Sequence, residues 1–293
     1  MKRIVAFTLT ALLAAASNAA PAFAQAQDQE QQIGAQVYAE LAKKGEIIPR
    51  PNAMYAVLDP IATRIKGVAD SQYDYPFKFI LVHEKQPNAF AVPGGNVYVT
   101  DSLVNFVQNK EELAGVLCHE TAHDIHHDVL NNMQKAQTTG TIIGIVGALT
   151  GLDKSGLGQF GENIAYQLQT TKFSRAVEHD ADAKGAVTCA QGGYNPWGMV
   201  WLFQNFEKAG AGGSMEALSD HPTDDHRIED LQREFAASPS LFGRFSSDIA
   251  TGIPVHSSAS GYHAPRSHPT YASAHHVAKH HAAYHAAYCC APK

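Results

Sequence analysis

The pentapeptide His119-Glu120-Thr121-Ala122-His123 constrains this chain more than any other feature of its sequence. It lies in a predicted helix, because Asn109 is a favourable N-cap, Glu112 follows three residues later as in a capping box, and apolar residues come next. Four residues advance a helix by about 400°, so the two histidines lie one turn apart on one face and can bind one zinc ion. Glu120 lies beside that face, where it can act as a general base. We expect this helix to run to about Asn131.

The pentapeptide by itself also fits a solvated helix face rich in histidine. The chain has 16 histidines, and the pair His126-His127 follows directly. The apolar first half of the helix instead favours a position inside the fold.

A hydrolytic zinc site needs a third protein ligand and an open fourth position for water. Glu178 and Asp182 lie four residues apart, on one side of a helix predicted at about 161–190. One of them could bind the metal while the other orients a zinc-binding histidine. The residues alone leave this set of candidates open: Glu162, Glu178, His179, Asp180, Asp182 and His221.

The order of predicted elements indicates an α+β fold. Helices are expected at 28–44 and 53–69, followed by strands at 77–83 and 96–100 on either side of the Gly94-Gly95 turn. Further helices are expected at 197–208 and 224–235. We therefore expect a helix-dominated fold with a small antiparallel sheet.

The N-terminus has the pattern of a secretory signal peptide over residues 1–24. Lys2 and Arg3 precede an apolar run, and the A-x-A sequence Ala22-Phe23-Ala24 predicts cleavage after Ala24. The alternative is an uncleaved anchor, but the apolar run is too short to span a bilayer. No cysteine lies at the cleavage site, so we expect a periplasmic or secreted protein without an N-terminal lipid.

Residues 246–293 have the composition of a disordered tail. Apolar periodicity fades from about Ser246, and from His256 the chain consists mainly of Ala, His, Ser, Tyr and Pro. Loose binding of zinc or copper and low-complexity drift are both compatible with this composition. The globular domain is therefore expected at 25–245.

Net charge and apolar segments restrict the partners of the chain. A formal net charge of −6 argues against nucleic acid, which needs a basic face. Segment 138–152 (TTGTIIGIVGALTGL) is uncharged but too short to span a bilayer. We expect a buried or flap-like hairpin near the cleft, with peripheral membrane contact as the alternative.

The four cysteines leave the disulfide pattern open. Export permits disulfides, but spacing does not define the pairing of Cys118, Cys189, Cys289 and Cys290. Cys118 points away from the histidine face, so we expect a buried core residue rather than a ligand. The oligomeric state is also open.

Four ordered motifs resemble a gluzincin family of zinc metallopeptidases, the one that includes HtpX, Oma and the periplasmic BepA- and LoiP-type proteases. They are NAFAVPGGNVYVTDSLV (Asn88 to Val104), HETAH, SRAVEHDAD (Ser174 to Asp182) and HPTDDHRI (His221 to Ile228), and the resemblance covers roughly Gln32 to Phe235. It implies a zincin-like metalloprotease domain that holds one zinc ion per chain and acts on proteins or peptides.

The resemblance also implies roles for single residues. Glu178 would be the third zinc ligand, and Asp182 would hold a zinc-binding histidine. Arg175 would anchor the ligand helix, and Arg227 would form a supporting ion pair.

His221 matches the histidine of the family's HP motif and has two possible roles. It could hydrogen-bond the oxyanion of the tetrahedral intermediate, or it could bind zinc itself and close the open position, which would make the enzyme latent. The chain departs from the family where His127-Asp128 replace Arg-His, and this leaves the end of the zinc helix in question.

The predicted function is a zinc-dependent endopeptidase for unfolded or misassembled cell-envelope proteins, in protein quality control. The substrate would pair with a sheet edge formed by Asn96, Val97, Tyr98 and Val99. A zinc-binding periplasmic chaperone or scaffold is the alternative, although a structural site would not need Glu120. A metal-storage protein built on the tail is a third possibility.

Overall fold

The computed structural model describes residues 29–138, 168, 172–209, 221 and 225–255. The expected signal peptide at 1–24 lies outside the described residues, as do positions 139–152 of the apolar segment and the chain from residue 256 onward. No helix within the described ranges is long and apolar enough to cross a membrane.

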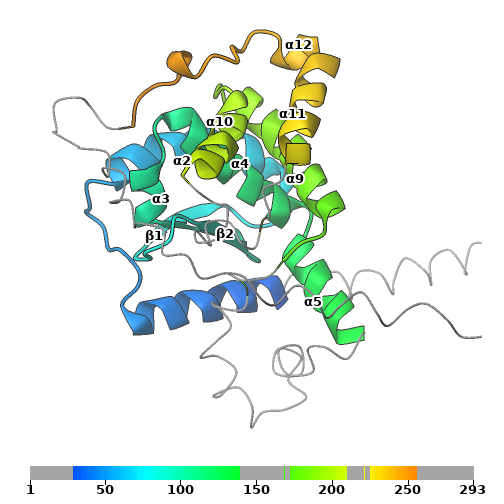
Figure 1. The fold of residues 1–293 in the computed structure, drawn as a ribbon. Coiled ribbons are helices and arrows are strands. Elements are labelled where there is room, and N and C mark those ends of the chain that lie inside the picture. Colours follow the sequence, from blue (N-terminus) through cyan, green and yellow to red (C-terminus); the bar gives the residue numbers. More distant parts are fainter. Residues whose placement is uncertain (1–28, 139–167, 169–171, 210–220, 222–224, 256–293) are drawn as a thin grey trace, which may run out of the picture. The chain divides into compact units, whose positions relative to one another are not determined.

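A three-stranded sheet lies at the centre of the described fold (Figure 1). Its strands are β1 (Lys78–Val82), β2 (Ala89–Val92) and β3 (Asn96–Thr100), in the order β1-β3-β2. β3 is parallel to β1 and antiparallel to β2, so the predicted α+β class is confirmed but the sheet is mixed rather than antiparallel. Gly94 and Gly95, with φ of 94° and 83°, close the β2–β3 hairpin.

β3 is the central strand, which corrects one sequence-based expectation. Asn96, Val97, Tyr98 and Val99 were expected to form a sheet edge that pairs with substrate. That expectation is wrong, because β1 and β2 occupy both hydrogen-bonding edges of β3. The outer strands are β1 and β2, and the outer edge of β1 is partly occupied by the bridge between Ile47 and Val82.

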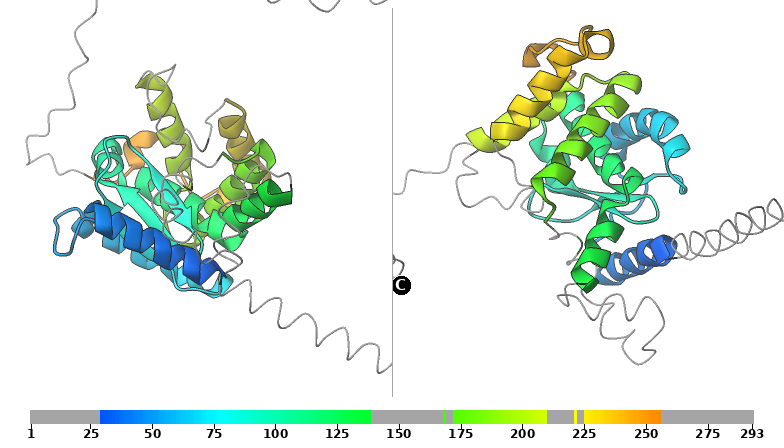
Figure 2. Two further views of the ribbon diagram at one scale, coloured as in Figure 1. Left: turned by 90° about the horizontal axis from the view of Figure 1, so that it is seen from below. Right: turned by 90° about the vertical axis from the view of Figure 1, so that its right-hand side faces the viewer.

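Helices cover both faces of the sheet (Figures 1 and 2). On one face, the helix of residues 29–44 packs Ile33 and Val37 against Phe90 and Tyr98. The opposite face contacts α2 (Tyr55–Ala69) and α4 (Lys110–Ile125). This alternation follows from the period of two along a strand, which sends neighbouring side chains to opposite faces.

α4 is the buried helix of the domain. It packs against α9 (Arg175–Gln191), α10 (Trp197–Lys208) and α2. Its start is as predicted: the Asn109 side chain accepts a hydrogen bond from the Glu112 backbone N–H at 2.9 Å. Other elements of the described fold are η1 (Asp70–Gln72), α3 (Asp101–Phe106), α11 (Asp225–Ala237), α12 (Pro239–Phe242) and η2 (Ile249–Thr251).

α4 ends earlier than the sequence predicts. The helix stops at Ile125 rather than near Asn131, and a second helix, α5 (Asp128–Thr138), begins after a two-residue break. His127 causes the break, since its φ of 54° lies in the left-handed region and cannot continue a right-handed helix.

A disulfide joins α4 to α9. Cys118 and Cys189 are both fully buried and bonded to each other, across a sequence separation of 71 residues. This pairing could not be read from the spacing of the cysteines. It links the helix of the HExxH pentapeptide to the helix that carries Glu178.

The domain extends further than residue 245. Ile253 donates its backbone N–H to Glu111 at 2.8 Å, Lys110 N donates to Ile253 O at 2.8 Å, and Trp201 Nε1 donates to Ser247 O at 3.0 Å. Residues 246–255 therefore contact the start of α4 and α10, and the boundary expected at 245/246 falls too early. Each of these hydrogen bonds uses a backbone group of residues 246–255, so the contacts leave no apolar periodicity to detect in that segment.

Candidate metal centre

The two histidines of the pentapeptide lie one turn apart on α4. Their Nε2 atoms are 3.1 Å apart, and the rings meet edge to face with centroids 4.6 Å apart. Both side chains are almost completely buried. The alternative of a solvated histidine face is therefore excluded for these residues.

Glu178 reaches the same point from α9. Ser174 caps this helix by accepting the N–H of Val177, so Glu178 lies in the first turn. Its Oε2 is 3.4 Å from His119 Nε2, and its Oε1 is 3.9 Å from His123 Nε2.

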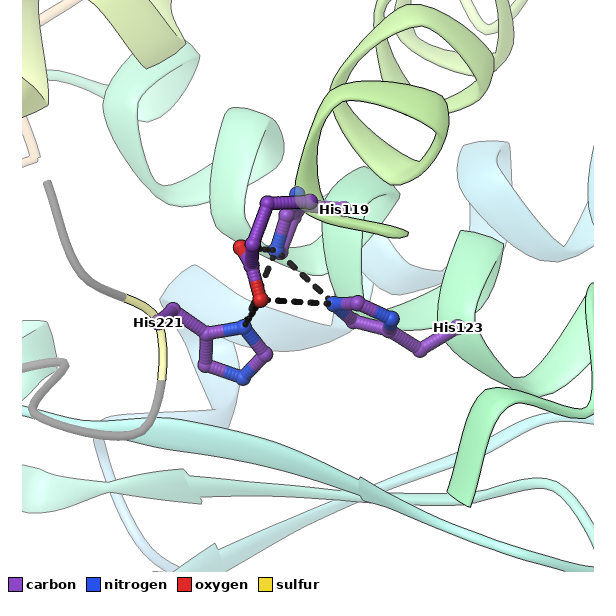
Figure 3. Close-up of side chains that lie close together, drawn as sticks. His119, His123 and His221 are labelled. Carbon is purple, nitrogen blue, oxygen red and sulfur yellow. Dashed lines mark hydrogen bonds and ion pairs between the residues drawn. The ribbon is translucent and has the colours of Figure 1, made fainter. Parts of the chain in front are cut away.

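His221 completes the cluster from a distant part of the chain. Its Nδ1 lies 2.8 Å from Glu178 Oε1 and 3.3 Å from His119 Nε2. Figure 3 shows the rings of His119, His123 and His221 directed at one common point. The sequence left two roles open for this residue, and the structure places it among the candidate ligands.

The geometry of the four side chains fits a zinc ion. One donor atom from each of His119, His123, Glu178 and His221 lies within 4.8 Å of the others, and all four side chains are buried. Tetrahedral zinc bonded to N and O atoms at about 2.0–2.1 Å holds its ligands about 3.3 Å apart, close to the spacings found here. Buried Glu178 Oε2 accepts no hydrogen bond from the described residues, although Arg227 Nη1 is 3.0 Å away, so an oxygen remains for a cation.

Charged residues behind the cluster hold His119 and Glu178 in place. Asp182 Oδ1 lies 2.9 Å from His119 Nδ1. Arg227 donates two hydrogen bonds to Asp182, at 2.8 and 2.6 Å. Burial raises the pKa of Asp182, but Arg227 outweighs it and the resulting pKa is lowered, so this carboxylate stays ionised.

Burial and neighbouring charges set the protonation of the candidate ligands. Burial, followed by the nearby His119 and His221, holds the pKa of His123 well below its usual value, which favours the neutral, metal-binding imidazole. For His119, burial opposes protonation, but the adjacent carboxylates of Asp182 and Glu178 raise its pKa. Burial also acts against ionisation of Glu178, yet His221 and His119 lower its pKa, so it remains a carboxylate.

Glu120 is held beside the cluster by the sheet. Its Oε2 accepts the backbone N–H of Ala91, in β2, at 2.9 Å. Its Oε1 lies 3.7 Å from His221 Nε2. The side chain is 1% exposed, so a carboxylate is fixed next to the candidate metal position without being one of the four donors.

The other candidates lie farther away or outside the described residues. Arg175 is exposed in the first turn of α9, and its anchoring role stays a prediction. His179 and Asp180 are exposed on the same helix, and Glu162 falls in the part of the chain that is not described.

Two residues near the cluster were missed by the sequence reasoning. Phe173 stacks on the ring of His123, with centroids 4.5 Å apart and planes 15° apart. Asp128 Oδ2 lies 2.8 Å from His123 Nδ1. In the sequence, Asp128 stands out only as a departure from the family pattern, and no sequence feature indicates that Phe173 lies at the site.

The region that contains the four candidate ligands is similar to known peptidases. The sequence profile of peptidase family M48 matches residues 55–235. A beta-barrel assembly-enhancing protease of Yersinia pestis is 28% identical over 213 residues, which are 70% of this chain and 43% of the relative. The mitochondrial metalloendopeptidase OMA1 of Schizosaccharomyces pombe is 26% identical over 210 residues, 70% of this chain and 60% of the relative. Protease HtpX of Legionella pneumophila is 28% identical over 193 residues, 57% of this chain and 67% of the relative.

The matched region is only part of most of these relatives. The chain spans about half the length of the first relatives it matches. The similarity therefore concerns the domain that carries His119, His123, Glu178 and His221.

Proposed function

The chain belongs to peptidase family M48, and we propose that it is a zinc-dependent endopeptidase with Glu120 as its general base. One observation carries the proposal: two histidines and a glutamate converge in a buried cluster, and a second glutamate is fixed beside it. A purely structural zinc site has no use for that second carboxylate.

The residues support a hydrolytic mechanism. His119, His123 and Glu178 would hold the metal, which when bound supplies Lewis-acid polarisation of the attacking water and the scissile carbonyl. Glu120 takes a proton from the water through Oε1 and passes it to the leaving amine. The hydrogen bond from Ala91 N to Oε2 keeps the carboxylate aimed during both transfers.

We propose that His221 closes the fourth position and keeps the resting enzyme latent. Its Nδ1 lies within the donor cluster, at 2.8 Å from Glu178 Oε1, so His221 would supply the ligand that a hydrolytic zinc site leaves to water. A zinc ion with four protein ligands has the closed coordination of a structural site, and hydrolysis needs one position to open. Turnover should therefore rise in His221→Ala, whereas a role at the oxyanion predicts that it falls.

β2 is the strand that we propose pairs with an extended substrate. The C=O groups of Ala89 and Ala91 point away from β3, because Phe90 and Val92 supply the ladder bonds, and they could accept N–H groups of a substrate. The N–H groups of the same two residues already donate to Asn88 Oδ1 and Glu120 Oε2, so this edge lies next to the general base. Peptides N-methylated at successive positions test this edge. Cleavage should fall at every second methylated position, while an equal effect at all positions would contradict strand pairing.

The substrate class is a further part of the proposal. Two of the relatives bear the names beta-barrel assembly-enhancing protease and mitochondrial metalloendopeptidase, and the N-terminal sequence has the pattern of an export signal. We therefore propose unfolded or misassembled cell-envelope proteins as substrates, outside the cytoplasm.

The deciding experiment compares the purified protein with Glu120→Gln on unfolded casein, with zinc counted in both and His221→Ala assayed alongside. We expect cleavage by the wild type or by His221→Ala, no cleavage by Glu120→Gln, and one tightly bound zinc ion in each protein. Zinc binding with no cleavage in any variant would instead favour the chaperone or scaffold function. Absence of bound zinc would refute the proposal.

A further inference from the structure

Asp128 contacts the second histidine of the cluster on the side opposite the candidate metal position. Asp128 Oδ2 lies 2.8 Å from His123 Nδ1, and the two side chains are 11% and 1% exposed. The other ring nitrogen, Nε2, faces His119 Nε2 at 3.1 Å. The two nitrogens of His123 are thus divided between the carboxylate and the metal position.

This contact exists only because the helix is broken. Five residues advance a continuous helix by about 500°, so residue 128 would project about 140° away from His123. α4 instead ends at Ile125, His126 follows with φ −86° and ψ −2°, and His127 turns the chain with φ 54°. Figure 1 shows α5 leaving the end of α4 in a new direction. Asp128, its first residue, returns to the ring of His123.

The break is held by contacts from another layer of the fold. His127 Nδ1 lies 2.6 Å from Glu30 Oε1, on the helix of residues 29–44, and Glu30 is almost completely buried. Tyr73 donates its hydroxyl hydrogen to Glu30 Oε2 at 3.1 Å. Asn131 N also donates to His127 O at 2.9 Å. These contacts fix His127 in the left-handed backbone conformation, and this conformation sets the position of Asp128. Uncommon backbone conformations persist when contacts with the rest of the fold hold them in place.

We infer that Asp128 is a positioning residue for His123, as Asp182 is for His119. The carboxylate accepts the Nδ1–H of the neutral imidazole, which leaves the Nε2 lone pair directed at the metal and makes the ring a stronger donor. Each candidate histidine ligand then has its own carboxylate partner, at 2.8 and 2.9 Å. The inference rests on the metal site of the proposed function.

A competing role for Asp128 is to stabilise the start of α5 by its negative charge. Asp128→Asn removes the charge from both roles, but the roles differ in what they change: loss of the helix interaction lowers the stability of the metal-free protein, whereas loss of the His123 contact lowers the affinity for zinc. Asp180→Asn is the matched control. It removes one carboxylate from a nearby helix, but that side chain is 73% exposed and contacts no member of the cluster.

The experiment measures the affinity of each full-length purified protein for Zn²⁺, by competition with a chelating dye, and the thermal melting of each metal-free protein. We expect Asp128→Asn to lose about tenfold in zinc affinity and Asp128→Ala up to about 100-fold. Asp180→Asn should match the wild type. The metal-free melting temperature of Asp128→Asn should fall by no more than about 4 °C, because a charge in the first turn of a helix contributes only about 0.3–1 kcal/mol.

The possible outcomes are distinct. If the wild type binds zinc and Asp128→Asn binds it equally well, the inference is wrong and Asp128 serves only the helix start. An equal loss in Asp180→Asn would also overturn it, since general electrostatics would then explain the effect. If the wild type binds no zinc, the proposed function fails and this inference fails with it.

Discussion

Gly185 lies where α9 packs against the start of the HExxH pentapeptide. A Cβ atom at this position would lie 3.0 Å from both the Cα and the N of His119 and 3.1 Å from the carbonyl carbon of Cys118. Carbon atoms in normal contact are about 3.5–4.0 Å apart, so Gly185→Ala requires the helices to separate by about half an ångström. The obstructing atoms belong to the backbone of α4 and cannot rotate away.

Two opposing effects determine how much Gly185→Ala changes the free energy of unfolding. Alanine favours the helical conformation over glycine by about 1 kcal/mol. Overpacking a close interface costs about 1–3 kcal/mol, and the neighbouring Cys118–Cys189 disulfide prevents the helices from moving apart freely. We therefore expect Gly185→Ala to lower the free energy of unfolding by about 1–2 kcal/mol.

The same displacement should weaken the metal site. Glu178 lies seven residues before Gly185, on nearly the same face of α9, so a shift of that face also moves Glu178 relative to His119 and His123. Since a zinc–ligand bond is only about 2 Å long, we expect zinc affinity to fall at least about tenfold.

Urea unfolding of the metal-free protein and dye competition for Zn²⁺ measure the two effects. Gly67→Ala is the control, because Gly67 is in α2, is exposed, and would place its Cβ with no atom within 4 Å. It should stabilise the protein by up to about 1 kcal/mol and leave zinc affinity unchanged. The reasoning is refuted if Gly185→Ala is as stable as Gly67→Ala and binds zinc as tightly as the wild type.

Three further predictions concern the disulfide, a buried carboxyl group and the metal. Replacing Cys118 and Cys189 together by alanine should lower the free energy of unfolding by about 4 kcal/mol, from the chain entropy of a loop with a separation of 71 residues; a loss under about 1 kcal/mol in urea unfolding contradicts this. Burial, opposed by hydrogen bonds from Gln108, Asn109 and Asn205, raises the pKa of Glu112 from 4.5 to about 7, so the folded protein keeps a proton that the unfolded chain releases. The protonated Glu112 therefore contributes fully to the free energy of unfolding below pH 4.5, and this contribution falls by about 3 kcal/mol as the pH rises to 7. Urea unfolding at pH 5 and 7.5 should show a smaller loss of stability with pH in Glu112→Gln than in the wild type. An equal loss in both proteins would contradict the raised pKa. Removal of zinc by a chelator should lower the melting temperature by roughly 10 °C, because binding at 1,000 times the dissociation constant contributes about 4 kcal/mol, and identical melting curves would contradict a metal bound to the folded state.

Local patterns in the sequence were sufficient to predict the centre of the site. The start of α4 depends on Asn109 and Glu112, three residues apart, and the pairing of His119 with His123 depends on the turn of one helix. Interactions of this range are set by the regular geometry of the backbone. The α+β class could be predicted for the same reason, from the periods of 3.6 and 2 along helices and strands.

Contacts between distant segments could not be predicted in this way. From the residues alone Glu178 was one of several candidates, and only family resemblance singled it out, because the packing of α9 on α4 decides which acidic side chain meets the histidines. The order of the strands has a similar origin. The sequence marks 96–100 as a strand, but only the pairing of β1 and β2 on either side shows that it is central.

The sequence by itself determined the helix that carries the HExxH pentapeptide, the class of fold and the resemblance to a family of metallopeptidases. Only the tertiary structure decided that His221 joins the cluster, that Cys118 pairs with Cys189, and that Asp128 returns to His123. The physical reason is one of range. A cap or a helical turn is stabilised within a few residues, whereas the left-handed conformation of His127 depends on a glutamate 97 residues away.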